Sequence, residues 1–165
     1  MFNNDLKNKS YELLELCQAS HKRIVVAESC TGGLVSACLT EIPGSSNIFE
    51  LGFITYSNNA KMEELKVPKT LIDTVGAVSK EVACAMADGA LASSSRADLS
   101  LGVTGVAGPG GGSEEKPVGL VHLAVARLGR ATSHQKILIP GDRSAVRLAA
   151  VGIGINMLLN AARNL

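Results

Sequence analysis

Short apolar runs alternate along the chain with longer segments in which apolar residues recur every three or four positions. The runs are typical of buried strands, and the recurring apolar positions predict amphipathic helices. We expect strands at residues 24–27, 49–56, 97–104, 118–127 and 131–139. We expect helices at residues 6–20, 32–39, 58–65, 69–75 and 80–92, the last of these capped by Ser79, and a final helix from Asp142 or Ser144 to about Ala162.

The order of these elements predicts the fold class. Helices alternate with the first three strands, which favours a sheet covered by helices on both faces. The last two strands are joined by Leu128-Gly129-Arg130, a connection short enough for a hairpin. We therefore predict an α/β fold, a three-layer α/β/α sandwich with a mixed, mostly parallel sheet of about five strands that ends in an antiparallel hairpin. Its length predicts a single domain over residues 1–165.

Composition excludes several classes of function. Apolar residues make up 46% of the chain and charged residues 19%, as in a folded globular protein. A net charge of +1 and an aromatic content of 3% give no basis for binding nucleic acid or an acidic membrane surface, so we expect neither as a partner. The first ten residues do not resemble a signal peptide, and no apolar run approaches the ~20 residues that span a bilayer.

The cysteines and histidines show no metal-binding or redox motif. The cysteines are Cys17, Cys30, Cys38 and Cys84. No two of them form a C-x-x-C pair, which indicates a reduced, cytoplasmic protein. The three histidines are scattered in the sequence, and His122 and His134 lie in strand patterns that favour structural roles.

The first predicted strand leads into the turn Ser29-Cys30-Thr31-Gly32-Gly33. Open α/β sheets bind ligands at the carboxyl ends of their strands, and the first amides of the following helix favour an anionic or polarised oxygen. Ser29, Cys30 and Thr31 therefore stand where a nucleophile, or a group that binds one, is expected. The alternative is that Ser29 or Thr31 only caps the helix, as such residues commonly do.

Further polar residues follow the next two strands. Tyr56 ends the second strand, Lys61 lies five residues later, and Thr104-Gly105 ends the third. If these strands are parallel, their ends share one edge of the sheet. A lysine whose pKa is lowered by burial can take the proton of Ser29, and a tyrosine can relay it or hold the geometry. Alternatively, Lys61 is a solvated surface lysine and Tyr56 a strand residue with a hydrated hydroxyl.

The loop from Gly105 to Lys116 contains five glycines and a proline. Such a loop can admit a ligand close to its backbone, although it lacks the Lys-Ser/Thr ending of a P-loop. Arg143, at the start of the last helix, either holds a phosphate group or forms a surface ion pair with Asp142. These residues indicate a small-ligand site with a candidate serine nucleophile and do not name the substrate.

Seven motifs in one order give the chain a resemblance to a known family. They are Ala27-Glu28-Ser29-Cys30-Thr31-Gly32-Gly33, Pro43-Gly44-Ser45-Ser46, Gly52-Phe53-Ile54-Thr55-Tyr56-Ser57 with Lys61, Gly76-Ala77-Val78-Ser79, the run from Val103 to Gly111, Lys116-Pro117-Val118-Gly119, and Gly141-Asp142-Arg143. With these motifs the chain resembles the CinA C-terminal-domain family, in its standalone form, from Ser10 to Leu165.

This resemblance implies hydrolysis of nicotinamide mononucleotide to nicotinate mononucleotide and ammonia. Ser29 would be the nucleophile, Lys61 its general base, and Tyr56 would assist proton transfer or orient Ser29. The implied substrate-binding residues are Cys30, Thr31, Gly32, Gly33, Thr104 and Gly105 near the reacting carbonyl, and Ser46 and Arg143 near the phosphate. No metal and no cofactor are expected, and the partner is a small nucleotide.

Two other functions fit the same residues. One is a non-catalytic module of the same fold that binds a pyridine nucleotide or is associated with competence and damage. The other is a thiol enzyme that uses Cys30, since a helix N-terminus lowers the pKa of a thiol. Many family members carry a larger N-terminal domain linked to pyrophosphatase activity, and we expect none of that activity from these 165 residues. A homodimer is the default expectation, and the Ala- and Gly-rich last helix permits close packing against another helix or subunit.

Overall fold

A five-stranded mixed sheet forms the centre of the computed structural model, which describes residues 2–164. Its strands are β1 (Ile24–Glu28), β2 (Phe49–Ile54), β3 (Leu99–Gly105), β4 (Leu120–Arg127) and β5 (Arg130–Leu138), in the order β2-β1-β3-β4-β5. β1 runs parallel to β2 and β3, whereas β4 is antiparallel to both of its neighbours. The predicted mixed sheet with a final hairpin is confirmed, although several strand ends shift by one or two residues.

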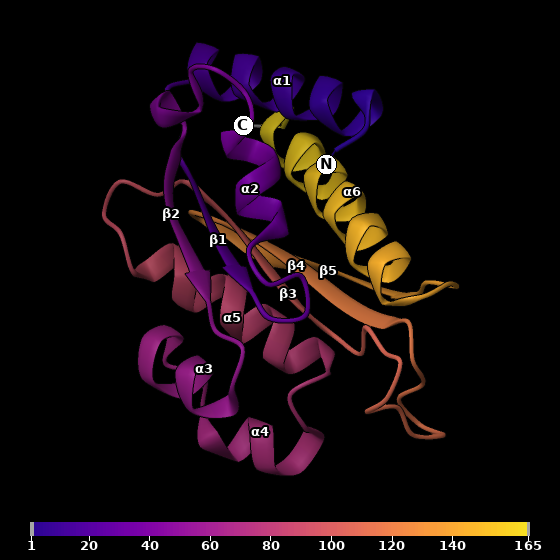
Figure 1. Cartoon of the computed structure of the whole chain (residues 1–165). Helices are drawn as coiled ribbons and strands as arrows, with labels where there is room; N and C mark the ends of the chain where they lie inside the picture. The colour runs from indigo at the N-terminus through magenta and orange to yellow at the C-terminus, as the bar shows by residue number, and fades with distance from the viewer. Residues whose placement is uncertain (1, 165) are drawn as a thin grey trace.

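Helices cover both faces of this sheet and make the fold an α/β/α sandwich (Figure 1). The helices are α1 (Asn4–Ala19), α2 (Leu34–Thr40), α3 (Asn58–Leu65), α4 (Lys69–Val75), α5 (Lys80–Ala92) and α6 (Arg143–Ala162), with a short 3-10 helix, η1 (Ser45–Asn47). On one face α6 packs against β3, β4, α1 and α2. On the other face α5 packs against β1, β3, β4 and β5, and α3 and α4 pack against α5.

The two central strands are almost entirely buried, which suits their apolar sequences. Gly102 lets α5 approach β3, because a Cβ atom at this position would lie 2.5 Å from the carbonyl oxygen of Ala83. The predicted Ser79 cap of α5 is also confirmed, since its side chain accepts a hydrogen bond from the amide of Val82. The first contact places α5 directly on β3, which pairs with β1 in the interior of the sheet.

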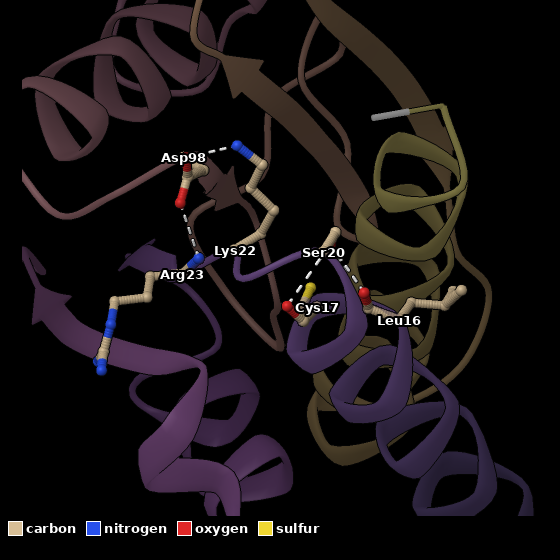
Figure 2. A network of polar contacts seen from close by, with 6 residues as sticks. All are labelled: Leu16, Cys17, Ser20, Lys22, Arg23 and Asp98. Atoms are coloured by element: carbon tan, nitrogen blue, oxygen red, sulfur yellow. Dashed lines mark hydrogen bonds and ion pairs between the residues drawn. The ribbon is translucent and has the colours of Figure 1, made fainter.

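A polar network joins the amino ends of β1 and β3 (Figure 2). The Asp98 carboxylate accepts hydrogen bonds from the Lys22 ammonium at 3.0 Å and from the backbone amide of Arg23 at 2.9 Å. The Ser20 hydroxyl donates to the carbonyl of Leu16, which closes the end of α1 just before these residues. The relative position of the two strands is therefore set at their amino ends, and Ser29 and Thr104 lie at their carboxyl ends.

By length and composition, α6 is the one helix in the described chain that could cross a membrane, with a mean hydropathy of 1.5. This result differs from the expectation that no stretch is long enough. Half of its most apolar stretch is buried inside the domain, however, against the sheet and against α1 and α2. Core helices of globular proteins have the same length and composition, and here the apolar residues cover β3 and β4.

Candidate active site

A cavity of about 210 Å³ lies at the carboxyl ends of β1, β2 and β3. It is lined by Ser29, Cys30, Tyr56, Asn58, Lys61, Ala77, Val78, Thr104, Gly105, Ala107 and Arg143. Seven of the predicted site residues are in this set, and they come from segments up to 114 positions apart. The parallel arrangement of the three strands brings them together, as the sequence predicted.

Lys61 lies inside the protein, and only 1% of its surface is exposed. It belongs to the first turns of α3, which starts after a Ser57 cap that accepts a hydrogen bond from the Ala60 amide. The ammonium donates to Ser29 Oγ at 2.9 Å, to the Thr55 carbonyl at 2.8 Å and to the Tyr56 carbonyl at 3.1 Å. The alternative of a solvated surface lysine is therefore wrong.

The three partners of Lys61 make the site suitable for proton transfer. Carbonyl oxygens only accept hydrogen bonds, so the Thr55 and Tyr56 carbonyls always face N–H groups of Lys61. The third position of the nitrogen faces Ser29, whose hydroxyl can both donate and accept. When Lys61 loses a proton, the lone pair is therefore directed at the Ser29 hydroxyl without any movement of the side chain.

Burial shifts the pKa values of Lys61, the candidate base, and of Cys30, the alternative nucleophile, in opposite directions. Desolvation lowers the pKa of Lys61 to about 8, so that roughly a tenth of the molecules hold a neutral amine at pH 7. Desolvation raises the pKa of the Cys30 thiol to about 11, so the thiol stays protonated. These shifts favour Ser29 over Cys30 as the nucleophile.

Glu28 caps α2, and neither Ser29 nor Thr31 does so. The carboxylate of Glu28 is fully buried and accepts from the amides of Gly33, Val35 and Ser36 and from the Ser36 hydroxyl, at 2.7–3.1 Å. The hydroxyl of Thr31 is buried and has no partner within the described chain. The helix N-terminus is therefore already neutralised by an internal anion and is not open to a ligand.

This arrangement restricts which amides can stabilise an oxyanion. The amide of Gly32 donates to the Ser29 carbonyl at 3.0 Å, and that of Gly33 donates to Glu28. Both glycines have positive φ angles, 58° and 93°, which favour glycine in this turn. Gly32 and Gly33, which were expected near the reacting carbonyl, therefore offer it no free N–H donor in this geometry. Within residues 2–164 the amides of Cys30 and Thr31 donate to no backbone oxygen and are therefore free; Cys30 lines the cavity, and Thr31 is the next residue along the chain and is fully buried.

Arg147 was not predicted from the sequence, yet it holds the same turn from the far side. Its Nε donates to the Cys30 carbonyl at 3.2 Å and its Nη2 to the Thr31 carbonyl at 2.9 Å. Asn58, Ala77, Val78 and Ala107, which line the cavity, were also missed. Arg147 follows Arg143 by four residues and so lies on the same face of α6, which is the only signal that sequence offered.

Arg143 and Tyr56 meet at the rim of the cavity. Arg143 Nη2 donates to the Tyr56 hydroxyl at 3.1 Å, and Nη1 donates to the Gly108 carbonyl at 2.8 Å. Asp142 instead caps α6 by accepting from the Ala145 amide, so the suggested ion pair between Asp142 and Arg143 does not form. The Tyr56 hydroxyl thus lies with Arg143, and the backbone of Tyr56 orients Lys61.

Two further predicted residues have contrasting positions. The Thr104 hydroxyl donates to the Ala77 carbonyl at 2.9 Å and holds the segment before α5 against β3. Ser46 lies in η1, before β2, and is therefore at the amino ends of the strands. The prediction that Ser46 helps to bind phosphate in this cavity is wrong for a single chain, because Ser46 lies at the opposite ends of the strands and does not line the cavity.

Two histidines that are distant in the sequence meet beside the site. His122 on β4 lies opposite Thr104 in the strand register, and its Nδ1 is 2.9 Å from Nε2 of His134 on β5. Burial lowers the pKa of His122 to about 4 and also lowers that of His134. The pair is therefore neutral at pH 7. Within the described residues, no group of three His, Cys, Asp or Glu side chains could hold a metal ion.

These features define a class of protein: an open α/β domain with a buried serine–lysine pair at the carboxyl ends of its parallel strands. The chain belongs to the CinA C-terminal domain family, whose model matches residues 6–162. It is 44% identical to the CinA-like protein of Akkermansia muciniphila over 156 residues, which are 93% of this chain and 37% of that protein. The chain thus spans about a third of the length of the curated relatives that it matches.

Solved structures match along almost their entire length. The competence/damage inducible protein CihA of Agrobacterium tumefaciens has a TM-score of 0.94 and 43% identity, with 97% of this chain and 98% of that chain covered. The CinA superfamily protein of Escherichia coli has a TM-score of 0.90 and 31% identity, with 98% and 93% covered. The names of these two solved structures refer to competence and damage and state no substrate.

Proposed function

We propose that the chain hydrolyses the carboxamide of nicotinamide mononucleotide through a serine ester intermediate. The observation that carries the proposal is the buried contact between Lys61 Nζ and Ser29 Oγ at 2.9 Å, with two carbonyls that hold the remaining N–H groups. A lysine with a lowered pKa beside a serine hydroxyl is an established way to activate a nucleophile. A module that only binds a nucleotide does not need this arrangement.

The proposed reaction uses the residues as follows. Ser29 Oγ attacks the carboxamide carbon, and its proton passes to neutral Lys61. The resulting oxyanion accepts hydrogen bonds from the amides of Cys30 and Thr31, and one such donor typically lowers a barrier by about 3 kcal/mol. Lys61 then donates its proton to the leaving nitrogen, and ammonia departs. A water molecule, deprotonated by Lys61, attacks the ester, releases nicotinate mononucleotide and restores the Ser29 hydroxyl.

The substrate is proposed from the family motifs together with the shape and charge of the site. The cavity of about 210 Å³ is narrow and is suited to a flat ring with its carboxamide at Ser29. Arg143 lies at the rim, where its guanidinium can contact a phosphate that remains outside. The fold and cavity therefore support a nucleotide whose base enters first, with its phosphate toward α6.

The test is ammonia release from nicotinamide mononucleotide by the purified chain and its Ser29→Ala, Lys61→Ala and Cys30→Ala variants. We expect turnover to fall by at least a thousandfold in the first two variants and to persist in Cys30→Ala. Loss of turnover in Cys30→Ala alone would indicate a thiol enzyme. A folded wild-type chain that binds the nucleotide without releasing ammonia would instead indicate a non-catalytic binding module.

A further inference from the structure

Within the described chain, the hydrogen bonds of Arg147 go to the backbone of the turn at residues 29–33, which carries Ser29. Its guanidinium donates to the carbonyls of Cys30 and Thr31 at 3.2 and 2.9 Å. It lies on α6, 116 positions from Thr31 in the sequence. A Cβ atom at Gly32 would lie 3.3 Å from its Nη2, so the guanidinium packs directly on the turn.

One of these carbonyls belongs to the same peptide unit as a free amide. The carbonyl of Cys30 and the amide of Thr31 are the two ends of one planar peptide group, and they point in opposite directions. A cation at the carbonyl end therefore fixes the direction of the N–H bond. It also makes that N–H a stronger donor, because hydrogen bonds in series polarise one another.

The charge of Arg147 is available to act in this way. Within the described chain Arg147 forms no ion pair with a carboxylate. Burial dominates the pKa of the neighbouring Cys30 thiol, and among the smaller effects the charge of Arg147 lowers this pKa. Glu28 has already neutralised the N-terminus of α2, which leaves Arg147 to provide positive potential behind the free amides.

We propose that Arg147 is a positioning residue for the oxyanion, acting through the Cys30–Thr31 peptide that it binds. It holds the Thr31 amide toward the carbonyl carbon that Ser29 attacks and strengthens this donor when negative charge develops there. The inference rests on the proposed function, since it assigns a role within that reaction. It predicts an effect on the tetrahedral state that is greater than the effect on binding of the flat carboxamide.

The chain offers a matched control at the other end of α6. Arg127 also donates from its guanidinium to two backbone carbonyls, those of Ala161 at 2.8 Å and Asn164 at 3.1 Å. It does not line the candidate cavity. Arg127→Met therefore removes the same kind of tether as Arg147→Met, and any loss due only to a weakened fold should be similar in the two variants.

The first measurement compares kinetics. We expect Arg147→Met to lower kcat for nicotinamide mononucleotide by ten- to a hundredfold with less than a threefold change in KM, and Arg147→Lys to recover only part of the loss. Arg127→Met should change kcat by less than threefold. A loss in Arg147→Met that appears only in KM, or that is matched by Arg127→Met at similar stability, would overturn the proposal.

The second measurement does not require turnover. Pyridine-3-boronic acid is the probe: Ser29 Oγ adds to its boron atom, the hydroxyl proton moves to Lys61, and a tetrahedral anionic adduct forms with no leaving group. We expect Arg147→Met to weaken this adduct at least tenfold and to shift the NMR signal of the Thr31 amide. If the wild-type chain forms an adduct that Arg147→Met weakens but releases no ammonia, the substrate proposal fails and the role of Arg147 stands. If Arg147→Met changes neither turnover nor the affinity of the adduct, the role of Arg147 is overturned and the substrate proposal stands. A wild-type chain that neither releases ammonia nor forms the adduct overturns both proposals.

Discussion

Lys61 Nζ and Ser29 Oγ lie 2.9 Å apart although the two residues belong to different segments, and 1% and 8% of their surfaces are exposed. Ser29 follows the central strand β1, and Lys61 belongs to the helix after the edge strand β2. The parallel pairing of β1 with β2 therefore creates the contact. A water-poor site keeps the lysine pKa low, and two carbonyls keep the nitrogen directed at the serine.

The pH dependence of the reaction follows from the pKa of Lys61. Burial lowers it to about 8, and only the neutral amine can accept the Ser29 proton. We expect kcat/KM for ammonia release to rise about tenfold per pH unit below pH 8 and to level off above it. A profile measured from pH 6 to 9.5 checks this, with Lys61→Arg inactive throughout because arginine stays protonated. A flat profile over this range would rule out Lys61 as the base.

The histidine pair predicts a loss of stability in acid that is independent of catalysis. Burial, followed by the charge of His134, lowers the pKa of His122 to about 4, whereas an unfolded histidine titrates near 6.5. Between these values the unfolded state binds more protons, so the free energy of unfolding falls as the pH drops from about 6.5 to 4. At the acid end of this window, His122 accounts for a loss of about 3 kcal/mol in the free energy of unfolding.

Urea unfolding of the wild-type chain and of His122→Gln, at pH 7 and pH 4.5, measures this contribution. Carboxylates also titrate in this window, but they do so in both proteins, and the difference between the two pH dependences isolates His122. We expect the wild-type chain to lose about 2 kcal/mol more than the variant. Equal losses of unfolding free energy in the two proteins would mean that water reaches His122 in the folded state and that its pKa is not lowered there.

Glu28 provides a test of how the turn is held. In Glu28→Gln, an NH₂ group replaces one carboxylate oxygen and faces the amides of Gly33 and Val35, or that of Ser36, which also donate. We expect a loss of about 2 kcal/mol in the free energy of unfolding, together with a lower kcat, because buried donors are left without acceptors. Glu63→Gln, an exposed change on α3, is the matched control and should alter neither quantity. An unfolding midpoint for Glu28→Gln equal to that of the control would contradict this account.

Periodicity and turn residues were sufficient to predict the sheet, the helices and the edge at which the site lies. The Ser79 cap and the bounds of α3, α4 and α5 followed from local sequence, and these are confirmed. The burial of Lys61 did not follow, because a single lysine in a short helix is usually solvated, and its buried contacts are with Ser29 and with the segment after β2, which lie elsewhere in the sequence. Local sequence patterns thus predicted the strand ends at which the site lies, but they did not predict which of its side chains are buried.

Glu28 and Arg147 were missed for different physical reasons. The first predicted strand was ended at Ala27, so Glu28 was placed in the turn and the cap was sought in Ser29 or Thr31. An acid at the last position of a buried strand can reach the amides of the next helix, and this distinguishes it from a surface acid. Arg147 depends on α6 crossing the turn, a contact between distant segments that local sequence cannot indicate.

Tyr56→Phe separates the two parts of Tyr56 that contact the site. The backbone carbonyl accepts from Lys61 and is unchanged by the substitution, whereas the hydroxyl accepts from Arg143 and is removed. The side chain is 58% exposed, so its loss should barely affect stability. We expect kcat for ammonia release to stay within about fivefold of the wild-type value, because only an Arg143 contact at the rim is lost. KM for nicotinamide mononucleotide should rise more than KM for nicotinamide riboside, since Arg143 is the proposed phosphate contact. A fall in kcat of a hundredfold or more for both substrates would show that the hydroxyl leaves Arg143 and takes part in proton transfer at Ser29.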